Sequence, residues 1–335
     1  MAIRVLHVGL GPVGSSIARQ VVARPGFQLV GGVDVDPDKV DRDLGEVIGL
    51  DRALRTRVGV DPVRLLRSAR PDVVVLCTGS TLKAVLPQIE PVLKAKVALV
   101  STAEELAYPT RRNQRLWARV DRLARRARVP VLGTGVNPGF VMDLLPLALT
   151  TACERVDAVV VNRVIDARTR RLPFQQKIGA GLTMPQFKAQ VAQGSVRHLG
   201  FAESIQMIGD AMGWRFDRVT EDVTAKVATE TVASEFLAVD AGWVSGIVQD
   251  AVAYRRGQAR VRLHLEAYLG APESFDSVLI EGTPRLSLTI PGGIHGDAGT
   301  AAVVVNSIPP LLAARPGLRT MRDLPAPSFH VAGGR

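Results

Sequence analysis

The sequence has little cysteine and no long apolar run. Its two cysteines, Cys77 and Cys153, form no C-x-x-C pair, which argues against a zinc knuckle or a disulfide framework. No stretch approaches the roughly 18 consecutive apolar residues that a bilayer span requires. The first residues lead directly into a glycine-rich turn, which leaves no room for a secretory signal. We therefore expect a cytoplasmic protein without a membrane segment.

Aromatic residues are also scarce, at 4% of the 335 residues, while 42 Lys and Arg against 32 Asp and Glu give a net charge of +10. Much of the excess lies in residues 111–128, where arginines recur at helical spacing. This segment is interpreted as a solvated helix face, with an oligomer contact or a nucleic-acid patch as the alternatives. Since no stacking motif or DNA-reading motif accompanies it, we predict no nucleic-acid partner.

The length favours two domains. Residues 1–140 alternate apolar strands with amphipathic helices, which is typical of a parallel sheet covered on both faces. The predicted strands are Ile3–Val8, Phe27–Val33, Asp72–Thr78, Lys96–Ser101 and Pro130–Gly133, and the predicted helices are Pro12–Ala23, Val63–Ser68 and Leu82–Ala95.

Longer polar-apolar alternations follow, with helices expected around Pro185–Gln193 and Glu203–Met212. They predict a second, α+β domain over residues 141–300 with a mixed or antiparallel sheet, which binds substrate and forms the dimer contact. Residues 301–335 are expected to form a C-terminal helix, Ala301–Ala314, and a tail that return to the first domain.

A G-x-G-x-x-G motif directly follows the first predicted strand and opens the first predicted helix. Gly9 permits the tight turn, Gly11 lets the backbone approach a pyrophosphate, and Gly14 lets helix and strand pack closely. Asp34 closes the second strand 34 − 14 = 20 residues past the last glycine, where a carboxylate can bind an adenosine ribose. The sequence therefore predicts an α/β Rossmann domain whose dinucleotide site includes Gly9, Gly11, Pro12, Val13, Gly14 and Asp34.

The residues around Asp34 favour NAD over NADP. Asp36 and Asp38 surround the ribose 2′-position with negative charge, and no arginine adjoins Asp34. Lys39 and Arg42 can still reach this position, so NADP use stays open.

Short polar turns follow two of the later strands. Ligands of open α/β sheets bind beyond the carboxyl ends of the strands, so these turns are expected to border the cofactor. Helix capping by their Ser and Thr side chains is the alternative role. The residues concerned are Thr78, Gly79, Ser80, Ser101 and Thr102.

Two adjacent carboxylates, Glu104 and Glu105, follow the predicted strand Lys96–Ser101. A carboxylate at this edge can act as a general acid/base. Adjacent side chains at a helix start point apart, so one is expected to face the site and the other solvent or the helix N-terminus. An acidic first helical turn without a catalytic role is the alternative.

Several motifs together resemble one family. The segments are GLGPVG, STAEELAYP, GTGVNPGF, RRLPFQQKIGAGLT, GGIHGDAGTAAVVVNSIP and PGLRTMRDLP. They resemble the 2,4-diaminopentanoate dehydrogenases and the related native amine dehydrogenases, which share a two-domain plan with dihydrodipicolinate reductase. The resemblance implies NAD(P)-dependent oxidative deamination of an amine to a carbonyl compound and ammonia, and the reverse reductive amination. A reductase of another carbonyl or imine and a non-catalytic NAD(H) sensor are the alternatives.

The resemblance also implies roles for single residues. Glu104 is the catalytic acid/base, with Glu105 as the second candidate in the substrate pocket. Asn137 lies beside the nicotinamide, Phe140 lines the substrate pocket, and Asn306 contacts the carboxamide. A homodimer is expected from the family.

Three further features complete the predicted site. His295, flanked by glycines, is expected to line the pocket, with a structural loop role as the alternative. The candidates to bind a substrate carboxylate are Arg168, Arg170, Arg171 and Lys177, with a solvated or interdomain ion-pair role as the alternative. An apolar pocket with residues such as Phe140 and Phe174 would instead suit an alkyl amine. No histidine spacing suits a metal, so no metal is predicted. His7 is expected to be a packed core histidine.

Overall fold

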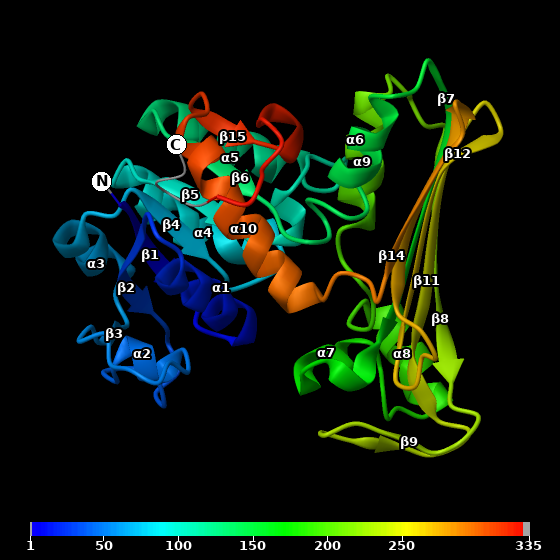
Figure 1. Cartoon of the computed structure of the whole chain (residues 1–335), viewed down its shortest axis with the longest axis horizontal. Coiled ribbons are helices and arrows are strands. Elements are labelled where there is room, and N and C mark those ends of the chain that lie inside the picture. The colour runs from blue at the N-terminus through cyan, green and yellow to red at the C-terminus, as the bar shows by residue number, and fades with distance from the viewer. Residues whose placement is uncertain (1, 331–335) are drawn as a thin grey trace. The chain divides into compact units, whose positions relative to one another are not determined.

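The computed structural model of the protein describes residues 2–330, and the chain divides into two compact units (Figure 1). One unit holds the residues up to Phe140 together with those from His295 onward, and the other holds Val141–Ile294. The chain therefore leaves the first unit once and returns to it. The return begins at His295, ahead of the expected position 301.

The first unit is built on a seven-stranded sheet with the order β15-β6-β5-β4-β1-β2-β3. Every neighbouring pair is parallel. The strand order reverses between β1 and β4, which creates the crevice where open α/β sheets bind ligands. The strands are β1 (Ile3–Val8), β2 (Phe27–Val33), β3 (Val58–Gly59), β4 (Val73–Leu76), β5 (Ala98–Ser101), β6 (Pro130–Gly133) and β15 (Gly317–Arg319).

Helices cover both faces of this sheet. Helices α1 and α10 pack together on one face, and α3, α4 and α5 lie on the other. The longer helices are α1 (Pro12–Ala23), α3 (Pro62–Ala69), α4 (Leu82–Lys94), α5 (Gln114–Ala127) and α10 (Gly296–Leu312), and the short ones are α2 (Leu44–Val47), η1 (Glu104–Leu106) and η3 (Met321–Asp323).

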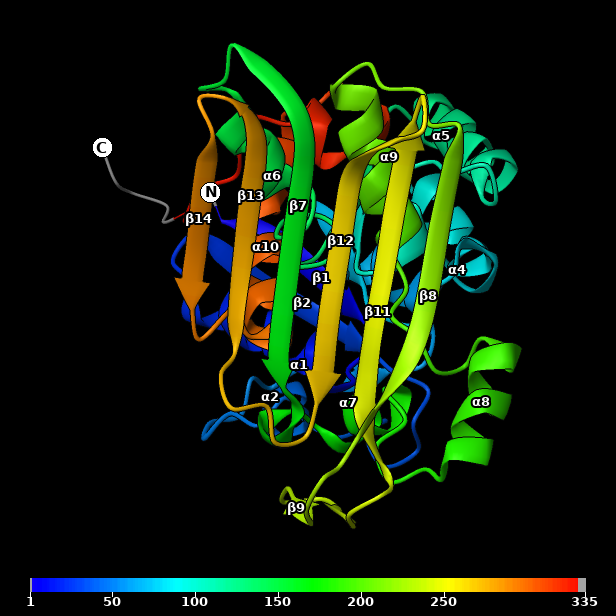
Figure 2. The ribbon, with the colours of Figure 1, turned by 90° about the vertical axis from the view of Figure 1, so that its right-hand side faces the viewer.

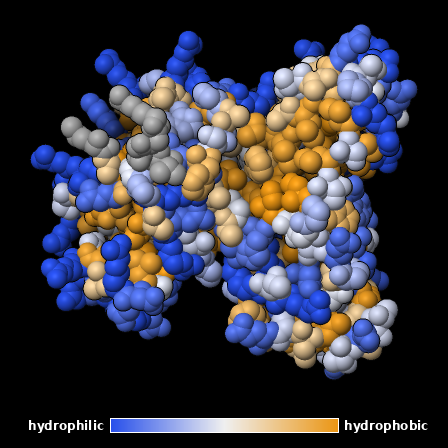
Figure 3. Space-filling model, in the orientation of Figure 1, coloured by the Kyte–Doolittle hydropathy of each residue, from blue (hydrophilic) through white to orange (hydrophobic). Residues whose placement is uncertain are grey.

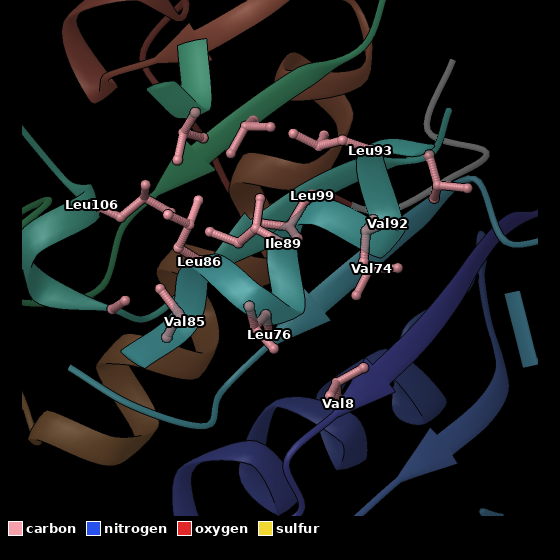
Figure 4. Close-up of a cluster of buried hydrophobic side chains, with 14 of the residues drawn as sticks. Val8, Val74, Leu76, Val85, Leu86, Ile89, Val92, Leu93, Leu99 and Leu106 are labelled. Carbon is pink, nitrogen blue, oxygen red and sulfur yellow. The ribbon is translucent and has the colours of Figure 1, made fainter. Parts of the chain in front are cut away.

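The core of this unit forms where α4 meets the sheet (Figure 4). Leu82, Leu86, Ile89 and Leu93 recur three or four residues apart and are buried on one face of the helix. The strand residues that they meet, such as Leu99, are fully buried. Each side chain of this kind stabilises the fold by about 2 kcal/mol, so the core holds the strand ends in fixed positions.

The second unit is built on a six-stranded sheet with the order β14-β13-β7-β12-β11-β8 (Figure 2). Strands β7 and β12 are parallel and the other neighbours are antiparallel, so the sheet is mixed. Its strands are β7 (Arg155–Asp166), β8 (Arg218–Val227), β11 (Val244–Arg255), β12 (Gln258–Tyr268), β13 (Phe275–Thr283) and β14 (Leu286–Pro291), and β9 (Val232–Ala233) pairs separately with β10 (Ala238–Val239).

One face of this sheet packs against α6 and α9. The opposite face lies open among the described residues, as the view onto the strands shows (Figure 2). Apolar residues gather on the surface over α6 and α9 (Figure 3). The helices of this unit are α6 (Leu144–Thr150), η2 (Ala167–Thr169), α7 (Leu172–Lys177), α8 (Met184–Gln193) and α9 (Phe201–Ala211).

These two sheets confirm the predicted fold class, a doubly wound parallel sheet with a second α+β unit that carries a mixed sheet. The bounds predicted for β1, α1, β2 and β6 agree with the structure, while α10 begins earlier than the predicted Ala301. Among residues 2–330, no helix is long and apolar enough to cross a membrane.

Candidate active site

The glycine turn between β1 and α1 has the backbone geometry that a close ligand contact requires. Gly9 has φ +89°, and a Cβ there would meet the carbonyl oxygen of Cys77 at 2.5 Å. A Cβ on Gly14 would meet the Gly9 oxygen at 1.9 Å, so only glycine lets α1 lie this close to β1. A Cβ on Gly11 would meet no described atom within 4 Å. The backbone at Gly11 therefore borders open space.

The amides at the start of α1 point toward this space. Pro12 is the first helical residue, and within the described chain no side chain caps the helix. Ser15 N donates to Gly11 O at 2.8 Å as the first bond of the helix, which leaves the N–H groups of Val13 and Gly14 available. Such an N-terminus binds anions. The turn therefore fits the pyrophosphate of a dinucleotide.

Asp34 lies at the end of β2 beside this turn. Its Oδ2 accepts from Leu10 N at 2.7 Å, and its Oδ1 accepts from Val35 N and Asp36 N. Desolvation raises the pKa of this carboxyl, but the backbone donors and Lys39 outweigh it and lower the pKa below the usual value. Asp34 is therefore an ionised acceptor, as a ribose hydroxyl requires.

The predicted polar turns lie along the same edge of the sheet. Backbone hydrogen bonds join neighbouring strands one residue beyond their ends, from Gly9 N to Val33 O, from Cys77 N to Val8 O and from Thr134 N to Ser101 O. The turns after these strands therefore border one crevice. Four of the residues predicted to border the cofactor are exposed or half-buried at this crevice: Thr78, Gly79, Ser80 and Thr102.

Ser101 departs from its predicted role as a cofactor contact. The residue is fully buried, its hydroxyl donates to Leu76 O at 2.9 Å, and it accepts from Ala103 N at 3.1 Å. A buried hydroxyl with both bonds inside the protein does not reach a ligand. Ser101 instead fixes the turn that carries Glu104.

The two adjacent acids take different positions in η1. Glu105 Oε2 accepts from Leu82 N at 2.8 Å, so its carboxylate caps the N-terminus of α4. This contact turns one carboxylate oxygen of Glu105 toward α4, and the place of Glu105 in the substrate pocket stays a prediction. Glu104 is half-buried at the carboxyl edge of the sheet, between the buried Ala103 and Leu106. Of the two adjacent acids at this edge, Glu105 caps α4 and Glu104 does not.

The loop after β6 packs against the first turns of α10. Val136 N donates to Thr300 Oγ1 at 3.2 Å. Gly139 has φ +127°, and a Cβ there would meet Thr134 Oγ1 at 2.5 Å, so the loop is folded tightly on itself. Asn137 and Phe140, both predicted site residues, are half-buried in this loop.

His295 and Asn306 lie at different parts of α10. His295 is exposed and caps the helix, since its Nδ1 accepts from Ala298 N at 3.4 Å. Asn306 is well inside the helix, not in its N-terminal part as expected. Its Oδ1 accepts from Arg24, the residue at which α1 ends, and from His330 N. The side-chain oxygen of Asn306 is therefore used inside the protein, and the predicted carboxamide contact stays a prediction.

Cationic side chains cluster in the second unit. Desolvation and, to a smaller extent, nearby cations together lower the pKa of His198 to about 3. Arg163 is 3% exposed, and its Nε lies 3.5 Å from Asp276 Oδ1. The guanidinium of Arg170 lies 4.2 Å from the ring centre of Phe174. The cations that act on His198 are Lys177, Arg163, Arg170 and Arg197.

Sequence analysis missed Arg163, Arg197 and His198. Arg163 lies on the same face of β7 as the buried Val159 and Val161, so a charged residue at an inward strand position was the available signal. Arg168, which the sequence grouped with the cluster, instead pairs with Asp166 at 2.7 Å. Among residues 2–330, no three His, Cys, Asp or Glu side chains are placed to hold a metal ion.

The parallel sheet, the glycine turn at its switch point and the ionised Asp34 define an NAD(P)-dependent oxidoreductase. Residues 140–334 match the family described as the 2,4-diaminopentanoate dehydrogenase C-terminal domain. The 2,4-diaminopentanoate dehydrogenase of Acetoanaerobium sticklandii is 32% identical over 97% of this chain and 94% of its own. The chain belongs to the 2,4-diaminopentanoate dehydrogenase family.

Other known proteins agree with this assignment. An amine dehydrogenase of Streptomyces virginiae is 28% identical over 95% of this chain and 94% of its own. The structure of an amine dehydrogenase from Mycobacterium smegmatis covers 98% of both chains with a TM-score of 0.89 at 24% identity, which shows a shared fold. A dihydrodipicolinate reductase from Paenisporosarcina covers 94% of this chain and 97% of its own, with a TM-score of 0.50 at 16% identity. The expected family and its two-domain plan are confirmed.

Proposed function

We propose that the protein deaminates an amine oxidatively to a carbonyl compound and ammonia, and catalyses the reverse reductive amination, with Glu104 as the proton carrier. The observation that carries this proposal is the different placement of two adjacent acids. Glu105 caps α4, whereas Glu104 stays at the carboxyl edge of the sheet that carries the glycine turn. NAD(P), when bound, takes up a hydride in the oxidative direction and supplies it in reverse.

In the first unit, some residues would bind the cofactor and Glu104 would move the proton. Val13 and Gly14 would hold the pyrophosphate with their N–H groups, and Asp34 would accept from the adenosine ribose. In the oxidative direction, the carboxylate of Glu104 takes a proton from the water that adds to the substrate's iminium carbon. The protonated carboxyl then gives this proton to the nitrogen of the carbinolamine. As the C–N bond breaks, Glu104 takes the proton of the hydroxyl group and passes it to the ammonia, so the products are the carbonyl compound and ammonium. Glu104 ends the cycle ionised, as it began.

The test compares Glu104→Gln with the unchanged protein. The variant keeps the size of the side chain but cannot move a proton, so we expect kcat to fall by about 10²–10⁴. NADH binding, followed by fluorescence, stays unchanged. Equal turnover in the variant would remove Glu104 from the mechanism. In the reductive direction, NADH oxidation that does not depend on ammonia would instead indicate a reductase of another carbonyl or imine.

The cationic cluster of the second unit favours a substrate that carries a carboxylate, as 2,4-diaminopentanoate does. Arg163 Nη1 is buried without a hydrogen-bond partner among the described residues. Arg163 and three other cations surround His198, and burial with like charges keeps that ring neutral. A carboxylate could accept a hydrogen bond from this Nη1 atom of Arg163. An alkyl amine without a carboxylate would leave that one donor unsatisfied.

This substrate preference can be measured with Lys177→Met. We expect kcat/KM for 2,4-diaminopentanoate to fall at least tenfold while kcat/KM for 2-aminopentane changes little. Arg168→Met is the matched control, because Arg168 is not among the cations that act on His198. A loss of the same size for both substrates would argue against a carboxylate contact.

A homodimer through the open face of the six-stranded sheet also forms part of the proposal. Half-buried apolar residues such as Val160 and Val164 alternate with the buried Val159 and Val161 and thus lie on that face. A second copy would cover them. Light scattering is expected to give the mass of a dimer for the unchanged protein and the mass of a monomer for Val164→Arg.

A cytoplasmic location is proposed as well, because the reaction draws on the cell's nicotinamide pool.

A further inference from the structure

The carboxylate of Asp34 has little capacity left for a ligand. Each carboxylate oxygen has two lone pairs. Oδ1 uses both, for Val35 N at 2.8 Å and Asp36 N at 3.0 Å, while Oδ2 uses one for Leu10 N at 2.7 Å. Asp34 can therefore accept from one more donor, although an adenosine ribose offers two hydroxyls.

Lys39 occupies the space next to that last lone pair. Its Nζ lies 3.7 Å from Asp34 Oδ2 and 2.9 Å from Asp36 Oδ2. The backbone holds it there, since Lys39 N donates to Asp36 O at 3.0 Å. Desolvation lowers the pKa of the ammonium, but the two carboxylates outweigh it and raise the pKa above the usual value. Lys39 is therefore a fixed cation at the edge of the ribose position.

We propose that Lys39 is the residue that determines the choice between NAD and NADP in this chain, because its ammonium would contact the 2′-phosphate of NADP. An acid at the end of β2 normally disfavours a 2′-phosphate by charge repulsion. Here the ammonium compensates part of the charge of Asp34 and Asp36 and offers donors to the phosphate oxygens. Asp34 keeps its remaining lone pair for the ribose of NAD, so both cofactors find a partner.

Arg42, the other cation near this turn, has a different role. Its guanidinium pairs with Glu46 one turn along the chain and donates to Asp38 O at 3.0 Å. The first contact holds the guanidinium beside α2, and the second holds it to the turn before α2. Arg42 therefore serves as the matched control for a nearby positive charge.

The test uses adenosine fragments, because they differ only in the phosphate and need no turnover. The affinities of 5′-AMP and 2′,5′-ADP are measured by calorimetry on the full chain. We expect the unchanged protein to bind both ligands. Lys39→Ala is expected to weaken 2′,5′-ADP at least tenfold and to leave 5′-AMP within twofold. Lys39→Arg keeps both affinities, and Arg42→Gln changes neither.

Three results would overturn the proposal. The first is that the unchanged protein does not bind 2′,5′-ADP. The second is that Lys39→Ala loses the same affinity for both ligands, and the third is that Arg42→Gln selectively loses affinity for 2′,5′-ADP. Because no step of catalysis is measured, a failure of the amine dehydrogenase assignment and a failure of the Lys39 assignment give different results. NADH and NADPH titrations by fluorescence extend the comparison to the whole cofactors.

Discussion

The carboxylate of Glu105 accepts a hydrogen bond from the backbone N–H of Leu82 at 2.8 Å, although the two residues are 23 positions apart. The bond links η1, which follows β5, to the first turn of α4. Thr81 also caps this turn through Ala84 N. One of two adjacent acids is therefore structural, and its bond fixes the backbone from which Glu104 projects.

Replacing Glu105 separates stability from chemistry. Glu105→Gln keeps an acceptor but removes the negative charge at the positive end of α4, so we expect the free energy of unfolding to fall by about 1 kcal/mol. The kcat is expected to stay within about threefold. Urea unfolding and steady-state kinetics check the two effects. A loss of activity as large as that of Glu104→Gln would make Glu105 the proton carrier.

The glycine turn predicts opposite effects for two similar substitutions. A methyl group at Gly11 meets no described atom, so Gly11→Ala is expected to fold normally. It would still weaken NADH binding at least tenfold, because the methyl fills space that the pyrophosphate needs.

In Gly14→Ala, by contrast, the methyl meets the Gly9 oxygen at 1.9 Å, and we expect a loss of about 1–3 kcal/mol in stability. Thermal unfolding and NADH fluorescence measure both effects. Equal effects of the two variants on stability would contradict this distinction.

His7 makes the stability of the protein depend on pH. The residue is fully buried, and no polar group of the described chain bonds its ring nitrogens. Burial lowers its pKa to about 4, against the opposing effect of Asp34. As the pH falls below 6.5, the unfolded chain takes up the proton first. The free energy of unfolding therefore falls between pH 6.5 and about 4, by about 3 kcal/mol.

His7→Leu is expected to remove this share of the pH dependence. Urea unfolding at pH 7 and pH 4.5 compares the variant with the unchanged protein. Part of the slope stays, because His198 also has a lowered pKa and contributes in the same direction. An unchanged slope in the variant would show that His7 takes up its proton in the folded state.

The buried pair in the second unit predicts a large loss of stability. Arg163 and Asp276 are 3% and 2% exposed, so Asp276→Asn leaves a buried cation without its counter-charge. We expect a loss of about 3–5 kcal/mol, most of which the double variant with Arg163→Met recovers. The exposed pair of Arg155 and Asp157 provides the control, and Asp157→Asn is expected to cost less than about 1 kcal/mol. Urea unfolding measures all three.

The sequence alone predicted those elements whose signals lie within a few neighbouring residues. The bounds of β1 and α1 follow from an apolar run, a glycine turn and a proline at the first helical position, all within neighbouring residues. The division of Glu104 and Glu105 was also expected, because adjacent side chains diverge. Which acid turns toward α4 was not predictable, since Leu82 lies far away in the sequence.

Other site residues depend on partners that no local pattern reveals. Ser101 looked like a polar turn residue, yet Leu76 on the neighbouring strand uses its hydroxyl. Asn306 was assigned from a motif, but the length of α10 places it beside Arg24. Arg163 pairs with Asp276 only because β7 and β13 are neighbouring strands in which these two residues lie opposite each other.

The return of the chain at His295 has a consequence for how the protein is made. Helix α10 covers β5 and β6, and β15 extends the sheet beyond β6, yet both come from the last part of the chain. A nascent chain that ends before residue 295 therefore exposes the part of one face that α10 covers, together with one edge of its nucleotide-binding half. That half can be completed only after the ribosome has made β15, so release of the chain before residue 317 would yield aggregation-prone fragments that lack part of the nucleotide-binding unit.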